Sequence, residues 1–507
     1  MALLLQSTAQ AVQWLREHVA GTLSSDSRTI RPGDGFIAWP GAATDGRAHV
    51  PAAIALGAAA CLVEHEGASS FEFGGARVAS YQGLKKATGP IAAAWFDHPA
   101  QQMEVVAITG TNGKTSSAWW LAQALSKVKQ TLHVKAAVVG TLGVGIPPHV
   151  LPTGLTTPDP VQLHAALRSM ADAGVTACAI EASSIGLAEH RLAGLPVQVA
   201  VFTNFTQDHL DYHGSMEAYW KAKQALFAWP GLRAAVINCD DAQGAVLAAT
   251  LNNSGVDIWT TSCLQQARLR ASSISCGAQG LEFVVHEAEL SYPLLTRLMG
   301  DYNVANLLGV LGAMRALGVS LADAVDACAS LLAVPGRMDC VSLPGLPLVA
   351  VDYAHTPDAL HKTLSALRPV AQQRSGQLWC VFGCGGARDA GKRPLMGAIA
   401  AKGADRVVVT SDNPRNEDAA TIISHIVASI PDARRQTVKT EPDRAVAIAY
   451  AVSHAGNADV ILVAGKGHEN TQEIAGVHWP FSDLQHAQTA LDHRACSGAS
   501  DAARGYA

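Results

Sequence analysis

The sequence predicts an α/β protein of three domains built on mostly parallel sheets. Short apolar runs rich in Val, Ile and Ala recur along the chain, and most are followed by a turn and a helical pattern rich in Ala and Leu. The length of 507 residues exceeds what one hydrophobic core usually serves. A glycine-rich turn directly follows one apolar run. Together these features favour a central P-loop-type sheet domain and a C-terminal Rossmann-like α/β domain.

Composition argues against several classes of function. The net charge of −5 offers no basic field for nucleic acid and no polybasic membrane signal. No apolar run is long enough to span a bilayer, and the N-terminus lacks the basic region and cleavage site of a signal peptide. The ten cysteines include no CxxC pair, which is typical of reduced thiols. We therefore expect a cytoplasmic monomer, with no nucleic acid and no membrane as partner.

The first domain is expected over residues 1–100. It opens with a predicted strand and helix and continues through a turn-rich stretch, residues 24–41. An Ala-rich pattern over residues 49–65 then predicts a helix.

The second domain is expected over residues 101–334, and the third over residues 335–507. Pro335 and Gly336 mark the boundary, because they follow a long Ala/Leu helix. Predicted strands of the second domain cover residues 104–109, 177–181, 198–203 and 233–237. Those of the third cover residues 348–354, 378–383, 405–412 and 459–465. Such sheets bind ligands at the carboxyl ends of their strands, where the polar motifs of this chain lie.

The turn after residues 104–109 predicts a phosphate-binding site. Its glycines let backbone N–H groups face an anion, and the following helix adds its N-terminal dipole. Lys114 can reach the β- and γ-phosphates, and the Thr115 hydroxyl can ligate Mg²⁺. Ile108 stands where the general P-loop has its first glycine, so this is a shortened variant. The predicted nucleotide contacts are Gly110, Thr111, Asn112, Gly113, Lys114 and Thr115.

A second polar cluster follows two other predicted strands. Glu181 ends one, and Asp208, His209, Asp211 and His213 follow the next. A carboxylate and an imidazole at neighbouring strand ends suit a divalent cation shared with phosphate oxygens.

Residues 217–227 then predict an amphipathic helix carrying Lys221 and Lys223. Composition alone leaves open that both lysines are simply solvated.

At this point the motifs resemble a known family. "GTNGKT", "EASSIGLAEHR", "TNFTQDHLDYHG", "LMGDYNVANLLG", "PGRMD", "DYAHTPDAL" and "GCGGARDAGKRP" occur in order and together are similar to the Mur ligases of peptidoglycan synthesis. "SDNPR" and "AGKGHE" resemble the member that adds meso-diaminopimelate to UDP-N-acetylmuramoyl-L-alanyl-D-glutamate. The resemblance spans nearly the whole chain and implies an ATP-dependent amide ligase that works through an acyl phosphate, with ADP and phosphate as products.

The resemblance also implies roles for single residues on the nucleotide side. Lys114 and Thr115 correspond to the phosphate lysine and to a ligand of one of two magnesium ions, and Glu181 and His209 match the second magnesium site. Lys223 matches a lysine that CO₂ converts to a carbamate, an anion that helps to hold the metal. The implied catalytic lysines are Lys114, Lys223 and Lys392. Further nucleotide contacts implied are Asn303, Arg337, Asp352 and His355.

On the substrate side the resemblance implies two groups of contacts. The UDP-muramoyl-dipeptide would meet Ser27, Thr156, Thr157, Ser183 and Arg191. The incoming amino acid would meet Arg388, Asp412, Asn413, Pro414, Arg415, Gly465 and Glu469. Arginines can grip carboxylates in a bidentate fork, and the carboxylates of Asp412 and Glu469 can bind an ammonium group. A zwitterionic far end therefore fits diaminopimelate, whereas lysine would leave Arg415 unpaired.

Two positions depart from the family pattern. Ile185 stands where a histidine is common, and Glu189 where glutamine is common among substrate contacts. Neither lies on the phosphate turn, so the departures bear on fine substrate contacts rather than on the chemistry.

Two alternative functions stay open from the sequence. One is a ligase similar to folylpolyglutamate synthase, which shares the phosphate turn; "DNPR" and the full first domain speak against it. The other is a non-catalytic nucleotide-binding sensor of cell-wall precursors, against which the joint presence of Lys114, Glu181, His209, Lys223 and Lys392 argues.

Overall fold

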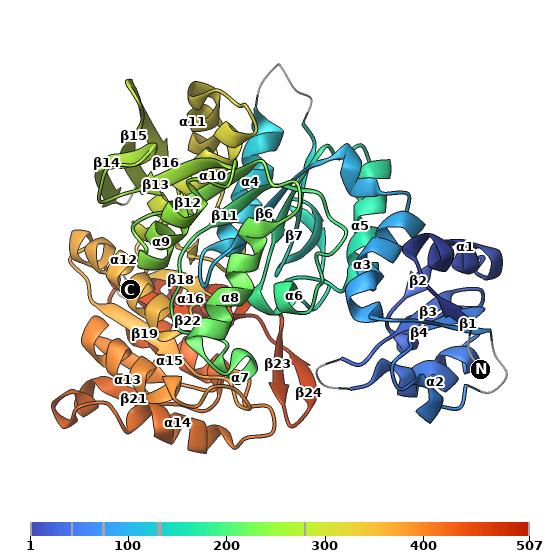
Figure 1. Cartoon of the computed structure of the whole chain (residues 1–507). Helices are drawn as coiled ribbons and strands as arrows, with labels where there is room; N and C mark the ends of the chain where they lie inside the picture. Colours follow the sequence, from blue (N-terminus) through green and yellow to red (C-terminus); the bar gives the residue numbers. More distant parts are fainter. Residues whose placement is uncertain (1–2, 42–43, 74–76, 129–133, 278–279, 505–507) are drawn as a thin grey trace.

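A computed structural model describes residues 3–41, 44–73, 77–128, 134–277 and 280–504, with side chains described as far as residue 496. Three sheets follow one another along the chain, each flanked by helices (Figure 1). The mixed α/β, mostly parallel architecture predicted from the sequence is confirmed.

The N-terminal unit is built on a five-stranded parallel sheet. Its strands are β1 (Leu3–Leu5), β2 (Leu23–Ser24), β3 (Gly35–Ala38), β4 (Ala60–Glu64) and β5 (Val78–Tyr81), in the order β1-β5-β4-β3-β2. Its helices are α1 (Thr8–His18), α2 (Val50–Ala55) and α3 (Leu84–Trp95), with short 3-10 helices η1 (Ser27–Thr29), η2 (Gly46–His49), η3 (Ala68–Ser70) and η4 (Pro99–Gln102).

The helix predicted over residues 49–65 is wrong for its second half. Helix α2 ends at Ala55, and residues 60–64 form the strand β4 between β3 and β5. All five residues of β4 are buried, because both faces of this parallel sheet are covered. A continuous buried run such as "ACLVE" lacks the alternation of a half-exposed strand, so periodicity alone does not separate it from a buried helix.

The central unit contains an eleven-stranded sheet. Its strands are β6 (Glu104–Thr109), β7 (Ala136–Gly140), β8 (Gly143–Ile146), β9 (His149–Leu151), β10 (Ala177–Glu181), β11 (Val197–Phe202), β12 (Ala234–Asn238), β13 (Asp257–Ser262), β14 (Leu269–Gly277), β15 (Gly280–Glu287) and β16 (Leu290–Thr296). The order is β16-β15-β14-β13-β12-β11-β6-β10-β7-β8-β9. The strands from β14 to β7 are parallel, and antiparallel strands extend both edges.

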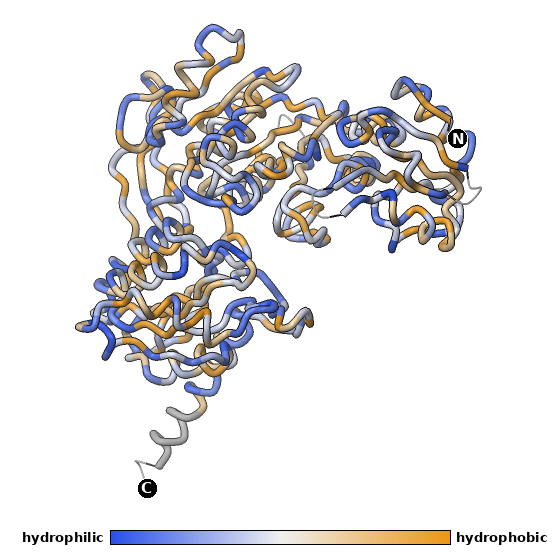
Figure 2. Tube along the Cα trace, turned by 60° about the horizontal axis from the view of Figure 1, so that its bottom comes forward, coloured by the Kyte–Doolittle hydropathy of each residue, from blue (hydrophilic) through white to orange (hydrophobic). Residues whose placement is uncertain are grey.

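Helices cover both faces of this central sheet. They are α4 (Lys114–Lys127), α5 (Pro160–Asp172), α6 (Ser184–Ala188), α7 (Leu210–His213), α8 (Met216–Gln224), η5 (Ala225–Ala228), α9 (Ala242–Leu251), α10 (Tyr302–Ala316) and α11 (Leu321–Ala329). One hydrophobic core joins the sheet to α4, α10 and α11, and a second joins its other face to α5 and α9. The orange, hydrophobic segments in Figure 2 run largely through the interior of each unit.

The C-terminal unit has a six-stranded sheet and a separate hairpin. The sheet contains β17 (Asp339–Val341), β18 (Leu348–Asp352), β19 (Leu378–Phe382), β20 (Arg406–Val409), β21 (Val438–Thr440) and β22 (Val460–Ala464), ordered β17-β18-β22-β19-β20-β21. The hairpin pairs β23 (Thr471–Ile474) with β24 (Val477–Pro480). The helices are α12 (Pro357–Gln373), α13 (Lys392–Gly403), α14 (Ala419–Val427), η6 (Asp432–Thr437), α15 (Arg444–His454) and α16 (Asp483–Arg504).

The three units contact one another through few elements. Helix α3 of the N-terminal unit packs on α5 of the central unit. A Cβ atom on Gly89 of α3 would lie 2.1 Å from the Ala193 carbonyl oxygen, so glycine permits this close approach. The central and C-terminal units meet at the phosphate turn, where Asn112 Nδ2 donates to Asp358 Oδ2 at 3.0 Å. Among the helices of the described ranges, none combines the length and apolar character needed to cross a membrane.

Candidate active site

The candidate site begins at one edge of the central sheet. Strand β6 lies between β10 and β11, all three parallel, so their carboxyl ends meet side by side. Thr109, Glu181 and Phe202 are the last residues of these strands. The phosphate turn and both polar motifs predicted from the sequence leave the sheet here, as expected at the carboxyl edge of a parallel sheet.

The phosphate turn connects β6 to the N-terminus of α4. Gly113 has φ of +87°, which favours glycine, and a Cβ atom there would lie 2.3 Å from Asn306 Oδ1. Lys114 Nζ donates to the carbonyl oxygens of Gly110 at 2.9 Å and Thr111 at 2.8 Å. Burial lowers the pKa of Lys114, although the carboxylates of Glu181 and Asp208 oppose this. The ammonium group of Lys114 is therefore bound by carbonyl oxygens of the turn itself.

Oxygen donors gather beside the turn. Thr115 Oγ1 donates to Glu181 Oε2 at 2.9 Å, and the buried Glu181 carboxylate also accepts the Thr141 backbone N–H at 2.8 Å. Arg337 Nη2, from the C-terminal unit, donates to Thr115 Oγ1 at 3.1 Å. A hydroxyl and a carboxylate in contact are ligands that suit Mg²⁺, which keeps several waters and shares phosphate oxygens.

Lys221 and Lys223, both on α8, have different environments. Lys221 is exposed, whereas the Lys223 side chain is 1% exposed and its Nζ donates to the Gly110 carbonyl oxygen at 2.7 Å. Burial, and then the charge of Lys114, holds the pKa of Lys223 well below its ordinary value. The reading of both lysines as solvated is therefore wrong for Lys223.

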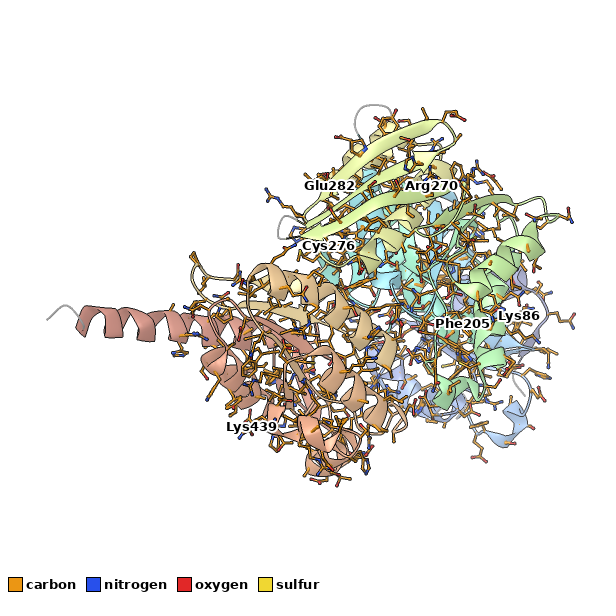
Figure 3. All side chains as sticks on the ribbon, turned by 90° about the vertical axis from the view of Figure 1, so that its left-hand side faces the viewer. Lys86, Phe205, Arg270, Cys276, Glu282 and Lys439 are labelled. Carbon is orange, nitrogen blue, oxygen red and sulfur yellow. The ribbon has the colours of Figure 1, made fainter. Side chains whose placement is uncertain are left out.

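Aromatic packing fixes α8 over the turn. Phe205, labelled in Figure 3, packs its ring 5.0 Å from that of Tyr219 and 5.3 Å from that of Trp220. The Tyr219 hydroxyl lies 3.1 Å from Thr111 Oγ1 on the turn itself. One turn further along α8 stands Lys223, with its Nζ 4.5 Å from the centre of the Tyr219 ring.

His209 also lines this region, at a residue of positive φ, +53°. Its Nε2 lies 3.5 Å from Asp208 Oδ2, and burial lowers the pKa of the imidazole. Burial alone would raise the pKa of Asp208, but the charges of His209, His355 and Lys114 lower it. Within the described ranges no three or more His, Cys, Asp and Glu side chains converge as a metal cage. A cation here would rely on the hydroxyl, waters and phosphate for its other ligands.

Two connected pockets enclose these groups. The first, about 140 Å³, is lined by Lys114, Thr115, Thr156, Glu181, Ser183, Asp208, His209, Lys223, Arg337 and His355, among others. The second, about 760 Å³, is lined by Asn303, Asp352 and His355, among others. Asn112, Gly113, Arg337 and His355 line both, so the phosphate turn opens into the larger cavity.

The residues expected around the nucleotide base and ribose line that larger cavity. Asn303 is buried and accepts at Oδ1 from Asn306 Nδ2 at 2.9 Å. Asp352 accepts backbone N–H groups of Met338 and Ala354, each at 2.8 Å, and burial raises its pKa. Burial, with the charge of Lys392, lowers the pKa of His355 to about 4.

Lys392, expected to be catalytic, starts α13 and donates from Nζ to the His355 carbonyl oxygen at 2.8 Å. Lys392 does not line the phosphate pocket. Lys392 therefore contacts the pocket only indirectly, through its hydrogen bond to His355, which does line the pocket.

Four residues expected to hold the muramoyl-dipeptide lie together next to Glu181. Thr156 Oγ1 lies 3.0 Å from Thr141 Oγ1, and Thr157 Oγ1 donates to the Glu181 carbonyl oxygen at 2.7 Å. Ser183 Oγ lies 2.9 Å from Thr157 Oγ1, and Arg191 Nη1 donates to the Thr157 carbonyl oxygen at 2.9 Å.

Ser27 lies apart from these four residues, in η1 of the N-terminal unit. It lines neither of the two pockets.

The two departures from the family pattern line a further pocket of about 320 Å³ between the N-terminal and central units. Ile185 and Glu189 face Trp39 and Thr44 across it. Glu189 Oε2 pairs with Lys85 Nζ at 2.8 Å, an ion pair that joins the two units.

The residues expected to bind the amino acid follow the carboxyl ends of β20 and β22, except Arg388, which follows β19. Asn413 Nδ2 donates to Glu469 Oε2 at 2.8 Å, and a Cβ atom on Gly465 would lie 2.5 Å from Asp412 Oδ2. The Pro414 carbonyl oxygen lies where a Cβ atom on Gly386 would clash, which ties this stretch to the loop carrying Arg388. Arg388 itself is more exposed, with Nη1 4.0 Å from Asp211 Oδ2 of the central unit.

Sequence reasoning missed three charged residues of this cluster. Lys466 is fully buried and donates from Nζ to Asn413 Oδ1 at 3.0 Å and Glu469 Oε2 at 2.8 Å. Its place within "AGKGHE" is a signal that could have found it. Glu473 pairs with Arg415, at 3.1 Å between Oε2 and Nε, so Arg415 is not free in this structure. Nothing in the sequence marks that pair, because it joins the loop after β20 to a hairpin almost sixty residues further along the chain.

The third missed residue is Arg444, fully buried at the start of α15. It pairs with Asp483 of α16 through two contacts of 2.7 Å. It also donates to the carbonyl oxygens of Ser411 at 3.2 Å and Ala464 at 2.9 Å. Those two residues immediately precede Asp412 and Gly465. The buried pair therefore holds the backbone that follows β20 and the end of β22 in place.

Family models match most of the chain. Residues 21–95 match the Mur ligase family catalytic domain, residues 108–314 the Mur ligase middle domain, and residues 336–467 the Mur ligase glutamate ligase domain.

Individual proteins match over nearly the full length. A UDP-N-acetylmuramoyl-L-alanyl-D-glutamate–2,6-diaminopimelate ligase of Acidovorax sp. (strain JS42) is 60% identical, covering 97% of this chain and 98% of its own. A solved structure of an enzyme with that name is 37% identical, covers 93% of this chain and 95% of its own, and has a TM-score of 0.64. Folylpolyglutamate synthase of Mycobacterium tuberculosis, with ADP and AMPPCP, is 19% identical with a TM-score of 0.60 over 75% of this chain and 92% of its own, a likeness of fold.

Proposed function

Because this chain belongs to the Mur ligase family, we propose that it joins meso-2,6-diaminopimelate to UDP-N-acetylmuramoyl-L-alanyl-D-glutamate at the expense of ATP. The observation that carries the substrate assignment is the 60% identity, over almost the whole length, to a relative named for this reaction. The cluster of Asp412, Asn413, Arg415 and Glu469, which offers both signs of charge to a zwitterion, agrees with it.

The proposed chemistry has two steps. An oxygen of the dipeptide's terminal carboxylate attacks the γ-phosphorus of ATP, the bond to the bridging oxygen breaks, and ADP leaves. The amine of the amino acid then attacks the acyl phosphate carbon, loses a proton, and expels phosphate to leave an amide. The carboxylates and phosphates are all anionic, so catalysis depends on positioning and on screening of charge.

The phosphate turn supplies part of that screening in our proposal. Lys114 would exchange its two carbonyl partners for phosphate oxygens, while the N–H groups at the start of α4 face the same anion. Thr115, Glu181 and His209 would hold Mg²⁺, which would supply positive charge against the phosphates. Arg337, already on Thr115, would bring a further positive charge from the C-terminal unit.

Lys223 fits the proposed carbamate for a physical reason. Only a neutral amine reacts with CO₂, and burial beside Lys114 holds the pKa of Lys223 well below its ordinary value. Once carbamylated, the side chain would present an anion to Lys114 and the metal rather than a second ammonium group.

The unit boundaries near residues 100 and 334 are part of the proposal. The N-terminal domain (residues 1–100) would bind the UDP end through Ser27, the central domain (101–334) ATP, and the C-terminal domain (335–507) the amino acid. We propose a monomer in the cytoplasm, as expected from the sequence.

The test is a product analysis. The purified protein is incubated with ATP, Mg²⁺ and UDP-N-acetylmuramoyl-L-alanyl-D-glutamate, in turn with meso-diaminopimelate, lysine and ornithine, and the products are weighed by mass spectrometry. The proposal expects one tripeptide product, with diaminopimelate. A parallel reaction with a reduced folate and glutamate tests the folylpolyglutamate alternative, and ADP release without any amide product would favour the non-catalytic sensor.

A further inference from the structure

The Arg415 guanidinium is engaged at two nitrogens within the chain. Nε faces Glu473 Oε2 at 3.1 Å, and Nη1 donates to the Gly386 carbonyl oxygen at 2.8 Å. A carboxylate therefore already lies on the arginine that we assign to the carboxylate of the incoming amino acid.

The backbone of Glu473 is held in place on both sides. Its N–H donates to Asn413 Oδ1 at 3.0 Å, and its carbonyl oxygen accepts the Arg415 N–H at 3.1 Å. Ala475, in the turn of the β23–β24 hairpin, donates its N–H to the Arg415 carbonyl oxygen at 2.7 Å. The hairpin thus runs alongside residues 413–415, and these backbone bonds hold the Glu473 side chain next to Arg415.

The side chains of this pair are nevertheless partly exposed to solvent. The Arg415 side chain is 24% exposed and that of Glu473 is 27% exposed. The neighbouring pair behaves differently, because Lys466 is fully buried and holds both Asn413 and Glu469. Glu473 can therefore exchange its partner at lower cost than Glu469 can, since the partner of Glu473 is partly exposed and an ion pair near solvent contributes little.

We propose that Glu473 is a specificity-determining residue that occupies Arg415 in place of the substrate's far carboxylate. The inference rests on the proposed function, and it changes how selectivity arises. Diaminopimelate exchanges the Glu473 carboxylate on Arg415 for its own, whereas lysine, which has none, leaves the internal pair intact. Arg415 is therefore never left unpaired by lysine, and the discrimination comes from what diaminopimelate gains in the exchange.

The test removes the competing charge with Glu473→Gln. This substitution removes the charge that pairs with Arg415 but keeps the backbone hydrogen bonds of residue 473, so we expect the fold to be retained. Glu473→Ala serves as a second variant. The melting temperature of each variant shows whether it is folded. KM for meso-diaminopimelate should fall about two- to five-fold, the range expected for a partly exposed ion pair, with KM for ATP unchanged. The kcat/KM for lysine should not rise, so that selectivity for diaminopimelate increases.

Two further variants separate the possible failures. Asp432→Asn removes one carboxylate from an exposed pair with Arg435 in the same unit, and it should leave KM for diaminopimelate unchanged. In an Arg415→Ala background, Glu473→Gln should have no further effect. If Arg415→Ala alone leaves KM for diaminopimelate unchanged, the assignment of Arg415 in the proposed function is wrong, and the inference falls with it. If Arg415→Ala raises that KM while Glu473→Gln leaves it unchanged or raises it, the inference alone is overturned.

Discussion

Lys114 is the residue on which the nucleotide assignment depends most directly. Replacing it with alanine removes the positive charge at the transferring phosphoryl group, so turnover should fall by about 10²–10³-fold or more, equivalent to several kcal/mol. The measurement is kcat for ATP-dependent tripeptide formation. Lys127→Ala, at the other end of the same helix α4, is the matched control and should retain activity. A near-normal kcat in a folded Lys114→Ala protein would show that this turn does not bind the ATP phosphates as proposed.

Lys223 offers a chemical test of the carbamate. Lys223→Ala should lose activity by about a hundred-fold, because the anion on the metal side is gone. A short carboxylic acid at high concentration should restore part of it by occupying the space that the side chain leaves. Lys221→Ala, two residues away on α8 and exposed, should be fully active and should not respond to the acid. Full activity of Lys223→Ala would contradict the proposal.

At the scale of residues, the sequence predicted which side chains lie together better than what each one contacts. Thr157, Ser183 and Arg191, which the resemblance assigned to one substrate, form one hydrogen-bonded group. Burial of Lys223 was not evident, because the lysine pattern on α8 reads as a solvated face. The Arg415–Glu473 pair could not be predicted from the sequence, since it depends on how the β23–β24 hairpin packs beside residues 413–415.

The phosphate turn, as an element, depends on its second glycine. In Gly113→Ala the new Cβ would lie 2.3 Å from Asn306 Oδ1, and Asn306 in turn holds Asn303 in the larger cavity. KM for ATP should rise about ten-fold or more, in addition to about 1–2 kcal/mol of backbone strain. Gly174→Ala is the control: its φ is +78°, but nothing lies within 4 Å of the added Cβ. It should lower the melting temperature without changing KM for ATP, and equal effects of both variants on KM would contradict the argument.

Among the elements, the sequence located the parallel strands well because each is a short buried run that ends in a turn. The predicted strand at residues 177–181 coincides with β10, and that at 378–383 with β19 to within a residue. The strands β14 to β16, of which β15 and β16 extend the sheet in antiparallel fashion, were not predicted. Both β14 and β16 contain many exposed residues, so neither is the continuous apolar run by which the parallel strands were predicted. The strand β4 was placed inside a predicted helix for a different reason: all five of its residues are buried, so the run lacks the alternation of a half-exposed strand.

The junction of the N-terminal and central units, at the scale of the whole molecule, should be sensitive to acid. His164 of α5 is fully buried, faces the Ala193 carbonyl oxygen at 3.3 Å, and has a pKa lowered by burial to about 4. The unfolded chain takes up this proton near pH 6.5, before the folded one does, so stability is lost as pH falls from about 6.5 to about 4. The loss should reach about 1 kcal/mol by pH 5.5.

Melting temperature as a function of pH checks this expectation. His164→Asn should flatten the acid limb of the curve, whereas His149→Asn, which removes an exposed histidine from the same unit, should leave that limb unchanged. An acid limb of the same slope in His164→Asn would show that the proton uptake takes place elsewhere.

The buried pair of Arg444 and Asp483 has a practical consequence for anyone who shortens or tags this chain. Helix α16 looks dispensable in a linear map, since it follows every motif quoted from the sequence. Its first residue is nevertheless the counter-ion of Arg444, and Leu491 fills the core between α15 and the sheet. A truncation before residue 483 would leave the Arg444 guanidinium buried without its counter-ion. It would thereby disturb the hydrogen bonds that Arg444 donates to the carbonyl oxygens of Ser411 and Ala464. An affinity tag therefore belongs after α16, and a minimal crystallisation fragment should retain at least the helix through Leu491.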